Sequence, residues 1–500
     1  MNVRVLSASY IGIDPYLVEV EVDVSSSLPS FAIVGLGDAA IDESKYRIKT
    51  ALNNCGYDMS PRRVVVNLSP AGIRKEGVQF DLPIAVGLML TMGFLRDDGD
   101  ILDNYLIMGE LSLDGRIKAV KGTVNTMILA KEKNFKGVLL PMENYREAGI
   151  IKGVEIIPIR TLHDVERFFK NREVPEAPVH EEYVAPPFEV DFSDVKGQVQ
   201  GKRGLEIAAA GGHNVLMVGS PGSGKSMLAK RIITIMPPMT EKEIIECTKI
   251  HSVAGALNSK RPVVNVRPFR APHHTSSPVS IIGGGTRIMP GEISLASGGG
   301  VLFLDEFPEF PRMLLESLRQ PLEDGIVAIT RAMYRVEFPS RFLLIAAANP
   351  CKCGFLYEGD RCRCSPHEVS QYRKKLSGPI LDRIDLHLEM RRLPEEELIQ
   401  APMGESSAEI RKRVEKARKI QENRNGEGLL NAYLGQKEVK KYCGIPPEDR
   451  DWFKGAIKML EISARGYDKI LKVARTIADL ADSESIRKEH LLEAISFRRR

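Results

Sequence analysis

Hydrophobic and polar positions along the chain predict three folded parts and one connector. In the first part, residues 1–170, stretches with strand composition (LVEVEVDV, FAIVGLG, RRVVVNLSP) alternate with a helical stretch, AAIDESKYRIKTALNNC. Residues 171–190 are rich in proline and acidic residues and show no periodicity, which is typical of a solvated linker. The pattern therefore predicts an α/β domain followed by a linker.

The second and third parts differ in their periodicity. Residues 191–393 contain three apolar strand cores, NVLMV, VLFLD and FLLIAAA, which predict a second α/β domain. Beyond residue 393 such stretches disappear, and YDKILKVARTIADL places apolar side chains on one helical face. These side chains are Tyr467, Ile470, Leu471, Ala474, Ile477 and Ala478. We therefore expect residues 394–500 to form a helical domain.

The composition is that of a soluble globular protein. Of the 500 residues, 27% are charged and 43% hydrophobic, and the net charge of +4 is too small to indicate nucleic-acid binding by itself. The longest apolar run, residues 82–95, is shorter than the roughly 20 residues that a membrane-spanning helix needs, and no secretory signal opens the chain. We expect a cytoplasmic protein without a membrane partner.

The stretch NVLMVGSPGSGKSML carries the most specific motif, a strand followed by G-x-x-x-x-G-K-S and a helix. In such a loop successive backbone N–H groups face the phosphates of a nucleotide at a helix N-terminus. Lys225 adds a positive charge near the β- and γ-phosphates, and Ser226 can ligate Mg²⁺. The ATP-binding residues are predicted to be Gly219, Ser220, Pro221, Gly222, Ser223, Gly224, Lys225 and Ser226.

Polar residues follow the next two strand cores. In GGVLFLDEF, Asp305 ends a buried strand and can hold Mg²⁺, while Glu306 can polarise a water molecule. In FLLIAAANP, Asn349 is placed to orient that water or to sense the γ-phosphate; capping the following turn is an equally good interpretation of this residue alone. The three strands predict one parallel sheet with its ligand at the C-terminal edge.

Three arginines are candidates for contact with the phosphates. Arg383, in SGPILDRIDLH, is an ordinary surface arginine if the chain is a monomer, but its position after the Asn349 strand suits an arginine finger that acts on a neighbouring subunit. Arg465, at the start of a C-terminal helix, is the candidate to reach the phosphates from that domain, and Arg475 is the weaker second choice.

Four of the seven cysteines lie within fourteen residues, in CKCGFLYEGDRCRC. In a reducing compartment, clustered cysteines indicate metal ligands before disulfides, and four thiolates suit a structural Zn²⁺. Free thiols or redox-labile pairs are the alternatives. The predicted zinc ligands are Cys351, Cys353, Cys362 and Cys364.

Local clusters of cations are candidates for DNA contact. The run KRPVVNVRPFRAPHH contains Arg267 and Arg270, and a solvated basic loop is an equal alternative to direct contact. His273 and His274, at its end, are expected to form local hydrogen bonds. The stretch IVAITRAMYRVEF predicts a β-hairpin with Arg331 near its tip and Arg335 just beyond; ion pairs within the domain are the alternative for these two arginines.

The motifs GSPGSGKS, RPFRAPHHTSS, PGEISLASGGGVLFLDE, NPCKCG and SGPILDRIDLH resemble those of the magnesium-chelatase-like AAA+ ATPases of the YifB/ComM family. The resemblance covers nearly the whole chain. It implies an AAA+ fold, ATP and Mg²⁺ as cofactors, and a ring hexamer; ComM proteins are branch-migration helicases of natural transformation. The implied catalytic residues are Lys225, Asp305, Glu306, Asn349, Arg383 and Arg465.

The first part of the chain resembles the proteolytic domain of Lon, a ribosomal-S5-like α/β fold, across residues 108–144. Lon-type catalysis needs a serine nucleophile and a lysine base. Alignment by eye brings Gln79 to the serine position and Val124 to the lysine position, and neither side chain can perform that chemistry. We therefore expect the fold to be kept and the protease activity to be lost.

Three function classes share this ATPase core. They are a DNA motor, the motor of a metal chelatase, and a protein-remodelling ATPase. The residues at positions 79 and 124 argue against proteolysis, whereas the Lon-like part and the cysteine loop argue against a chelatase motor. The sequence therefore favours an ATP-driven DNA motor, a hexameric helicase or branch-migration ATPase that acts on single-stranded or branched DNA.

Overall fold

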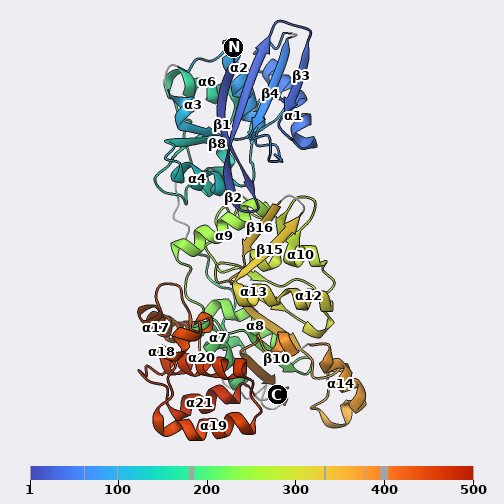
Figure 1. The fold of residues 1–500 in the computed structure, drawn as a ribbon, viewed down its shortest axis with the longest axis vertical. Coiled ribbons are helices and arrows are strands. Elements are labelled where there is room, and N and C mark those ends of the chain that lie inside the picture. The colour runs from blue at the N-terminus through green and yellow to red at the C-terminus, as the bar shows by residue number, and fades with distance from the viewer. Residues whose placement is uncertain are drawn as a thin grey trace.

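The computed structural model shows an elongated molecule in which the N-terminal, middle and C-terminal segments follow one another along the long axis (Figure 1). The structure describes residues 2–60, 62–97, 100–178, 185–258, 260–331, 334–376, 378–394 and 404–498.

The larger N-terminal sheet has the strand order β1-β2-β4-β3. Its strands are β1 (Asn2–Ile11), β2 (Asp14–Ser25), β3 (Ser30–Val34) and β4 (Arg63–Ser69). The helices α1 (Ala39–Asn54) and α2 (Asp81–Thr91) accompany it, and α2 packs on β1 and β2. The predicted helix at AAIDESKYRIKTALNNC is confirmed as α1, and Asp38 caps its first turn by accepting a hydrogen bond from the Ile41 N–H at 3.0 Å.

A smaller parallel sheet completes the N-terminal segment. It has the order β5-β8-β9, formed by β5 (Tyr105–Ile107), β8 (Gly137–Pro141) and β9 (Glu155–Ile159). Its accompanying helices are α3 (Ile101–Asn104), α4 (Thr123–Glu132), α5 (Tyr145–Ala148) and α6 (Leu162–Asn171), and a short ribbon pairs β6 (Glu110–Leu111) with β7 (Ile117–Lys118).

The middle segment is built on a five-stranded parallel sheet of order β11-β14-β17-β10-β18. Its strands are β10 (Val215–Gly219), β11 (Phe269–Arg270), β14 (Val301–Leu304), β17 (Leu343–Ala348) and β18 (Leu386–Met390). The three predicted strand cores are thus confirmed as β10, β14 and β17 of one parallel sheet. Because the strands are parallel, the residues that follow them meet at one edge.

Side chains alternate between the two faces of this sheet. Val215 and Met217 of β10 pack toward α7 (Val199–Gly211), α8 (Lys225–Ile235) and the C-terminal helices, whereas Leu216 packs on the opposite face. That opposite face is covered by residues around α12 (Arg312–Ser317) and α15 (Gly378–Leu381). The sheet is therefore buried on both faces, as parallel sheets are.

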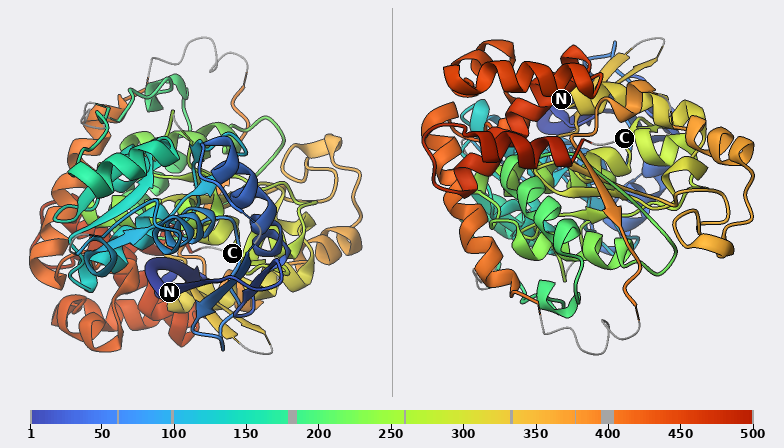
Figure 2. Two further views of the ribbon diagram at one scale, coloured as in Figure 1. Left: turned by 90° about the horizontal axis from the view of Figure 1, so that it is seen from above. Right: turned by 90° about the horizontal axis from the view of Figure 1, so that it is seen from below.

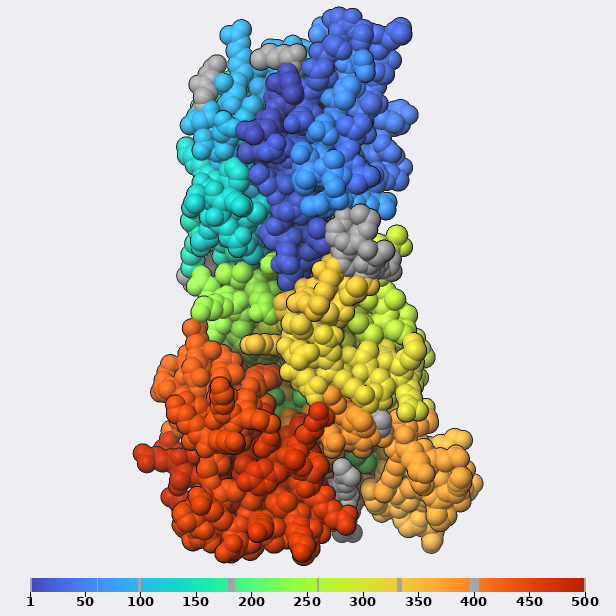
Figure 3. Space-filling model, in the orientation of Figure 1, coloured from blue at the N-terminus to red at the C-terminus, as the bar shows by residue number. Residues whose placement is uncertain are grey.

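Further elements of the middle segment surround the sheet. They are α9 (Glu241–Ala254), α10 (Pro278–Ile282), β12 (Gly283–Gly284), β13 (Met289–Pro290), α11 (Glu292–Leu295), α13 (Arg319–Asp324), β15 (Ile326–Arg331), β16 (Tyr334–Pro339) and α14 (Pro366–Lys374). The predicted hairpin is confirmed, since β15 and β16 pair antiparallel. The lobe that carries α14 projects from the body of the molecule (Figure 3).

Residues 404–498 contain only helices among their regular elements, as predicted. They are α17 (Ser407–Asn425), α18 (Gln436–Tyr442), α19 (Arg450–Met459), α20 (Ala464–Leu480) and α21 (Lys488–Ser496). The predicted apolar face lies on α20, where Ile470, Leu471, Ala474, Ile477 and Ala478 are buried. Figure 2 shows these helices and the α14 lobe on opposite sides of the middle segment.

Candidate nucleotide site and its surroundings

The G-x-x-x-x-G-K-S motif forms the turn between β10 and α8. Gly219 is the last residue of β10, and Lys225 is the first residue of α8. Gly222 and Gly224 have φ angles of +78° and +89°, a left-handed conformation in which a side chain would be strained. The two glycines therefore allow the turn that presents the N-terminus of α8.

The side chains after the three strands converge on this turn. Lys225 Nζ donates to the carbonyl oxygens of Gly219 and Ser220 at 2.6 and 3.0 Å, and it lies 3.3 Å from Asn349 Oδ1. Burial lowers the pKa of Lys225. The structure therefore brings together a lysine and an amide that are 124 residues apart.

Ser226 and Asp305 form the second half of the cluster. The Ser226 hydroxyl donates to Asp305 Oδ2 at 2.7 Å. Neighbouring ligands of an octahedral Mg²⁺ with 2.0–2.1 Å bonds lie about 2.9 Å apart. The two oxygen atoms therefore suit two adjacent positions around one Mg²⁺ ion.

Glu306 lies beside this pair in an unusual backbone conformation. Its φ is +52°, which is uncommon for a residue with a side chain, and its N–H donates to Asp305 Oδ1 at 2.9 Å. Its Oε2 lies 3.0 Å from Nδ1 of His274. The unusual φ and the contact with His274 make Glu306 a candidate functional residue beside the Ser226–Asp305 pair.

The two histidines of the basic run differ in their contacts. His273 bonds locally, with Nδ1 2.8 Å from the Thr275 hydroxyl, as predicted. His274 instead reaches Glu306, a contact that the sequence reasoning missed. The contact depends on the pairing of β11 with β14, which brings the residues after β11 beside those after β14 and which no local pattern in the sequence indicates.

Arg383 lies at the opposite edge of the same sheet. Its carbonyl oxygen accepts a hydrogen bond from Asn214 Nδ2 at 3.4 Å, and Asn214 directly precedes β10. Five strand residues span about 17 Å, so this edge is far from the P-loop that follows β10. Within one chain, Arg383 and Lys225 are therefore at opposite ends of β10.

Arg465 lies on the same side as Arg383. Glu323 Oε1 is 2.7 Å from Arg383 Nη2 and 3.8 Å from Arg465 Nη1, and all three residues line one pocket together with Asn214. The structure thus brings the two arginines together, but away from the phosphate loop of their own chain.

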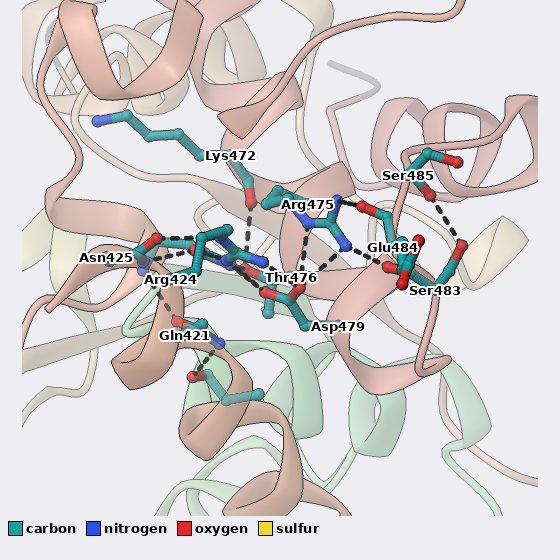
Figure 4. Close-up of polar contacts among 12 residues, drawn as sticks. Gln421, Arg424, Asn425, Lys472, Arg475, Thr476, Asp479, Ser483, Glu484 and Ser485 are labelled. Carbon is teal, nitrogen blue, oxygen red and sulfur yellow. Dashed lines mark hydrogen bonds and ion pairs between the residues drawn. The ribbon is translucent and has the colours of Figure 1, made fainter. Parts of the chain in front are cut away.

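Arg475 is engaged in a buried network within the C-terminal helices (Figure 4). Its Nε donates to Asp479 Oδ1 at 3.0 Å, and Nη1 donates to the Glu484 carbonyl oxygen at 2.8 Å. Asp479 also accepts from Arg424 at 2.6 Å. The prediction of Arg475 as a second candidate for phosphate contact is therefore wrong, because this side chain is buried and satisfied inside the helical segment.

Two of the predicted DNA-contacting arginines are also held by the protein itself. Arg267 is 6% exposed and binds both carboxylate oxygens of Glu243, at 3.0 and 3.1 Å. Arg270 forms a bidentate ion pair with Glu292, in which Nε lies 2.5 Å from Oε2 and Nη2 lies 2.7 Å from Oε1. These two arginines of the basic run are therefore less available to bind DNA than the composition of the run indicates. The expected DNA contact of Arg267 is wrong, because this side chain is buried.

The β15–β16 hairpin presents a different arginine. Arg335 is 65% exposed and pairs with Glu337 at 2.8 Å. An exposed pair of this kind contributes little and gives way readily to a phosphate. The side chain of Arg331 lies outside the described residues.

The hairpin rests on the N-terminal segment. Val336 and Phe338 of β16 are buried against Ile13, which lies in the turn between β1 and β2. A Cβ atom on Gly12 would lie 2.1 Å from Val336 Cγ1, so glycine is required for this approach. The N-terminal segment and the hairpin are therefore in tight contact.

The Lon-like positions lie beside this junction. Val124 is fully buried, and Gln79 is 6% exposed and donates to the Glu76 carbonyl oxygen at 2.9 Å. Glu76 also pairs with Arg287 of the middle segment at 3.3 Å. Both positions are therefore packed into the protein, and Gln79 lies beside a contact between the N-terminal and middle segments.

The four clustered cysteines directly follow β17. Their sulfur atoms all lie within 4.8 Å of one another, and they form the one potential metal-binding group of three or more residues within the part of the chain that the structure describes. Cys351 is buried, and Cys353, Cys362 and Cys364 are half-buried.

Among the described residues, no helix is both long and apolar enough to cross a bilayer.

Comparison with protein families gives three matches. Residues 191–398 match magnesium chelatase, subunit ChlI; residues 20–144 match subunit ChlI of Mg-chelatase; and residues 404–498 match the C-terminal part of magnesium chelatase subunit ChlI.

Two relatives that match over nearly their full length agree with these matches, and a third matches part of the chain. Uncharacterized protein YifB of Escherichia coli K12 is 40% identical over 489 residues, 98% of this chain and 95% of YifB. Competence protein ComM of Haemophilus influenzae is 41% identical over 503 residues, 99% of this chain and 97% of ComM. Lon protease 2 of Bacillus subtilis is 29% identical over 138 residues, 27% of this chain and 24% of that protein. The chain therefore belongs to the YifB/ComM family of magnesium-chelatase-like AAA+ proteins.

Proposed function

We propose that this protein is an ATP-driven DNA motor, a hexameric helicase or branch-migration ATPase that acts in recombination or natural transformation. The observation that carries the ATPase part of the proposal is the convergence of Lys225, Ser226, Asp305 and Asn349 at the C-terminal edge of the sheet. A lysine, two oxygen ligands and an amide at a helix N-terminus are the groups that phosphoryl transfer requires.

The side chains divide the chemistry among them. The N–H groups of the P-loop and Lys225 bind the phosphates, and Asn349 orients the attacking water. Glu306 accepts a proton from that water. At the same time the water oxygen bonds to the γ-phosphorus, and the bond between the γ-phosphorus and the bridging oxygen of ADP breaks. Mg²⁺ held by Ser226 and Asp305 would neutralise charge on the β- and γ-phosphates.

The position of Arg383 supports hydrolysis between subunits. Arg383 and Arg465 lie at the edge opposite their own P-loop, so a ring in which this edge faces the next subunit would bring both arginines to that subunit's nucleotide. An arginine supplied in this way stabilises transition-state charge and accounts for about 10³–10⁵-fold in rate. Glu323 holds Arg383 until the neighbour replaces it.

The β15–β16 hairpin supports DNA as the object that is moved. It presents the exposed cation of Arg335, and six copies around a channel would attract phosphates without reading bases. The 41% identity to a competence protein is in keeping with action on DNA.

The alternative is the motor of a metal-chelatase-like or protein-remodelling complex, which the family matches to magnesium chelatase favour. ATP hydrolysis measured at low salt with and without single-stranded, duplex and four-way-junction DNA separates the two. The proposal predicts that at least one DNA stimulates hydrolysis by the wild type, whereas Glu306→Gln stays inactive with each of them. A wild type that hydrolyses ATP at the same rate with and without each of these DNAs would favour the alternative.

A further inference from the structure

The sulfur atoms of the cysteine cluster are already spaced for one tetrahedral ion. Cys351 Sγ lies 3.3 Å from Cys353 Sγ and 3.9 Å from Cys362 Sγ, and Cys353 Sγ lies 3.7 Å from Cys362 Sγ. Four thiolates at 2.3 Å from a Zn²⁺ ion lie about 3.8 Å apart. The measured sulfur spacings are therefore close to those of a four-thiolate zinc site.

The loop that carries the cysteines has little else to hold it. Between Cys351 and Cys364 the regular structure is a single 3-10 turn, Gly359–Arg361, and only Cys351 and Gly354 are buried. A loop with so few apolar contacts cannot offset the entropy of fixing its backbone. A cross-link through the four sulfur atoms would supply the missing stabilisation.

The same loop packs against the P-loop. A Cβ atom on Gly354 would lie 2.7 Å from Cδ of Pro221, so the backbone of Gly354 lies directly against the Pro221 ring. The Ser220 side chain is near enough to Glu358 to lower the pKa of that carboxyl. Asn349, which contacts Lys225, is two residues before the first cysteine.

We propose that the four cysteines bind one Zn²⁺ per chain and that this ion holds residues 351–364 against Ser220 and Pro221, so that metal loading sets the affinity for ATP. The inference rests on the proposed nucleotide site. Four sulfur ligands leave no open coordination position, so the ion acts by fixing the loop and takes no part in the chemistry.

The first arm of the test measures metal alone. Elemental analysis of protein purified without added metal is expected to give about one zinc per chain, and Cys362→Ser is expected to lose it. Zinc-free wild type, or a disulfide within the cluster of protein kept under reductant, would overturn the metal site. Either outcome leaves ATP binding open to separate measurement.

The second arm measures the dissociation constant of a fluorescent ATP analogue. Removal of zinc from the wild type by a chelator is expected to weaken binding about tenfold, and zinc added back is expected to restore it. Gly354→Ala, which clashes with Pro221, is expected to weaken binding with zinc retained. Gly359→Ala is the matched control, because its φ is also positive but no atom lies within 4 Å of an added Cβ.

These outcomes separate the two proposals. Equal ATP affinity with and without zinc would overturn the coupling and leave the nucleotide site intact. One zinc per chain in a wild type that binds no nucleotide would instead contradict the proposed function. Circular dichroism of the metal-free protein shows whether a loss of affinity comes from general unfolding, which would also overturn the local coupling.

Discussion

Arg383 Nη2 lies 2.7 Å from Glu323 Oε1, at the edge of the sheet opposite the P-loop. The Arg383 side chain is 11% exposed, so it is held against its own chain in this structure. The ion pair with Glu323 holds the Arg383 guanidinium at a surface that is distant from the P-loop of the same chain. Proximity of this edge to a neighbouring subunit would give the arginine its function.

Arg383→Ala is expected to bind ATP normally and to lower the hydrolysis rate by about 10³-fold, because only the transition state loses a cation. Steady-state hydrolysis and nucleotide binding measured on the same preparation check this. Lys375→Ala, which removes a cation from a surface pair with Glu309, serves as the control. Mixing wild type with Arg383→Ala should lower activity more than dilution does; strictly proportional loss would contradict action between subunits.

His274→Ala is expected to lower kcat about tenfold without changing KM for ATP, because His274 contacts Glu306, the proposed base, and is not part of the P-loop. His273→Ala is a close control, since the two rings lie 4.2 Å apart but His273 contacts Thr275. An equal loss in both variants would show that the effect comes from the loop and not from the contact with Glu306.

Neutralising the hairpin by Arg331→Gln and Arg335→Gln together is expected to weaken DNA binding and to leave basal ATP hydrolysis intact. The slope of log K against log salt concentration should become shallower, because each lost phosphate contact removes about 0.7–0.9 from it. Lys416→Gln, an exposed ion-paired lysine on α17, is the control. Unchanged DNA affinity and salt slope in the folded double variant would rule out the hairpin as the contact.

Acid is expected to destabilise the joint between the sheet and the C-terminal helices. Burial lowers the pKa of His213 from 6.5 to about 4, and Thr476, Asp385, Lys469 and Lys472 surround the ring. The folded state therefore favours neutral His213, so its contribution is full above pH 6.5 and is lost as the pH falls toward 4.

Between pH 7 and pH 5 this residue should cost about 2 kcal/mol of unfolding free energy, measurable by urea denaturation at both values. His213→Gln cannot take up the proton, so the variant should lose about 2 kcal/mol less than the wild type over that interval. The same pH dependence in both proteins would assign the acid sensitivity to other groups.

Local patterns were sufficient to predict the strands β10, β14 and β17 and the residues that follow them. The reason is physical: buried parallel strands are short apolar runs, and their carboxyl ends share one edge. The pairing of Ser226 with Asp305 follows from that rule.

Contacts between distant parts of the chain were beyond the reach of local patterns. The sequence around Arg267 does not differ from that around a solvent-exposed arginine. Its burial depends on its ion pair with Glu243, which lies in the preceding helix α9. The contact of His274 with Glu306 depends on which strands are neighbours. Likewise, the place of Arg383 at the opposite edge depends on β18, a parallel strand that begins three residues later and that the apolar patterns did not predict.

The most direct test of the account is strand movement on a four-way DNA junction labelled on one arm. With ATP and Mg²⁺ at low salt, the wild type is predicted to convert the junction into separated duplex products, whereas Glu306→Gln is predicted to bind the junction and leave it intact. A wild type that binds the junction and hydrolyses ATP but leaves every strand in place would contradict the claim that this protein is a DNA motor.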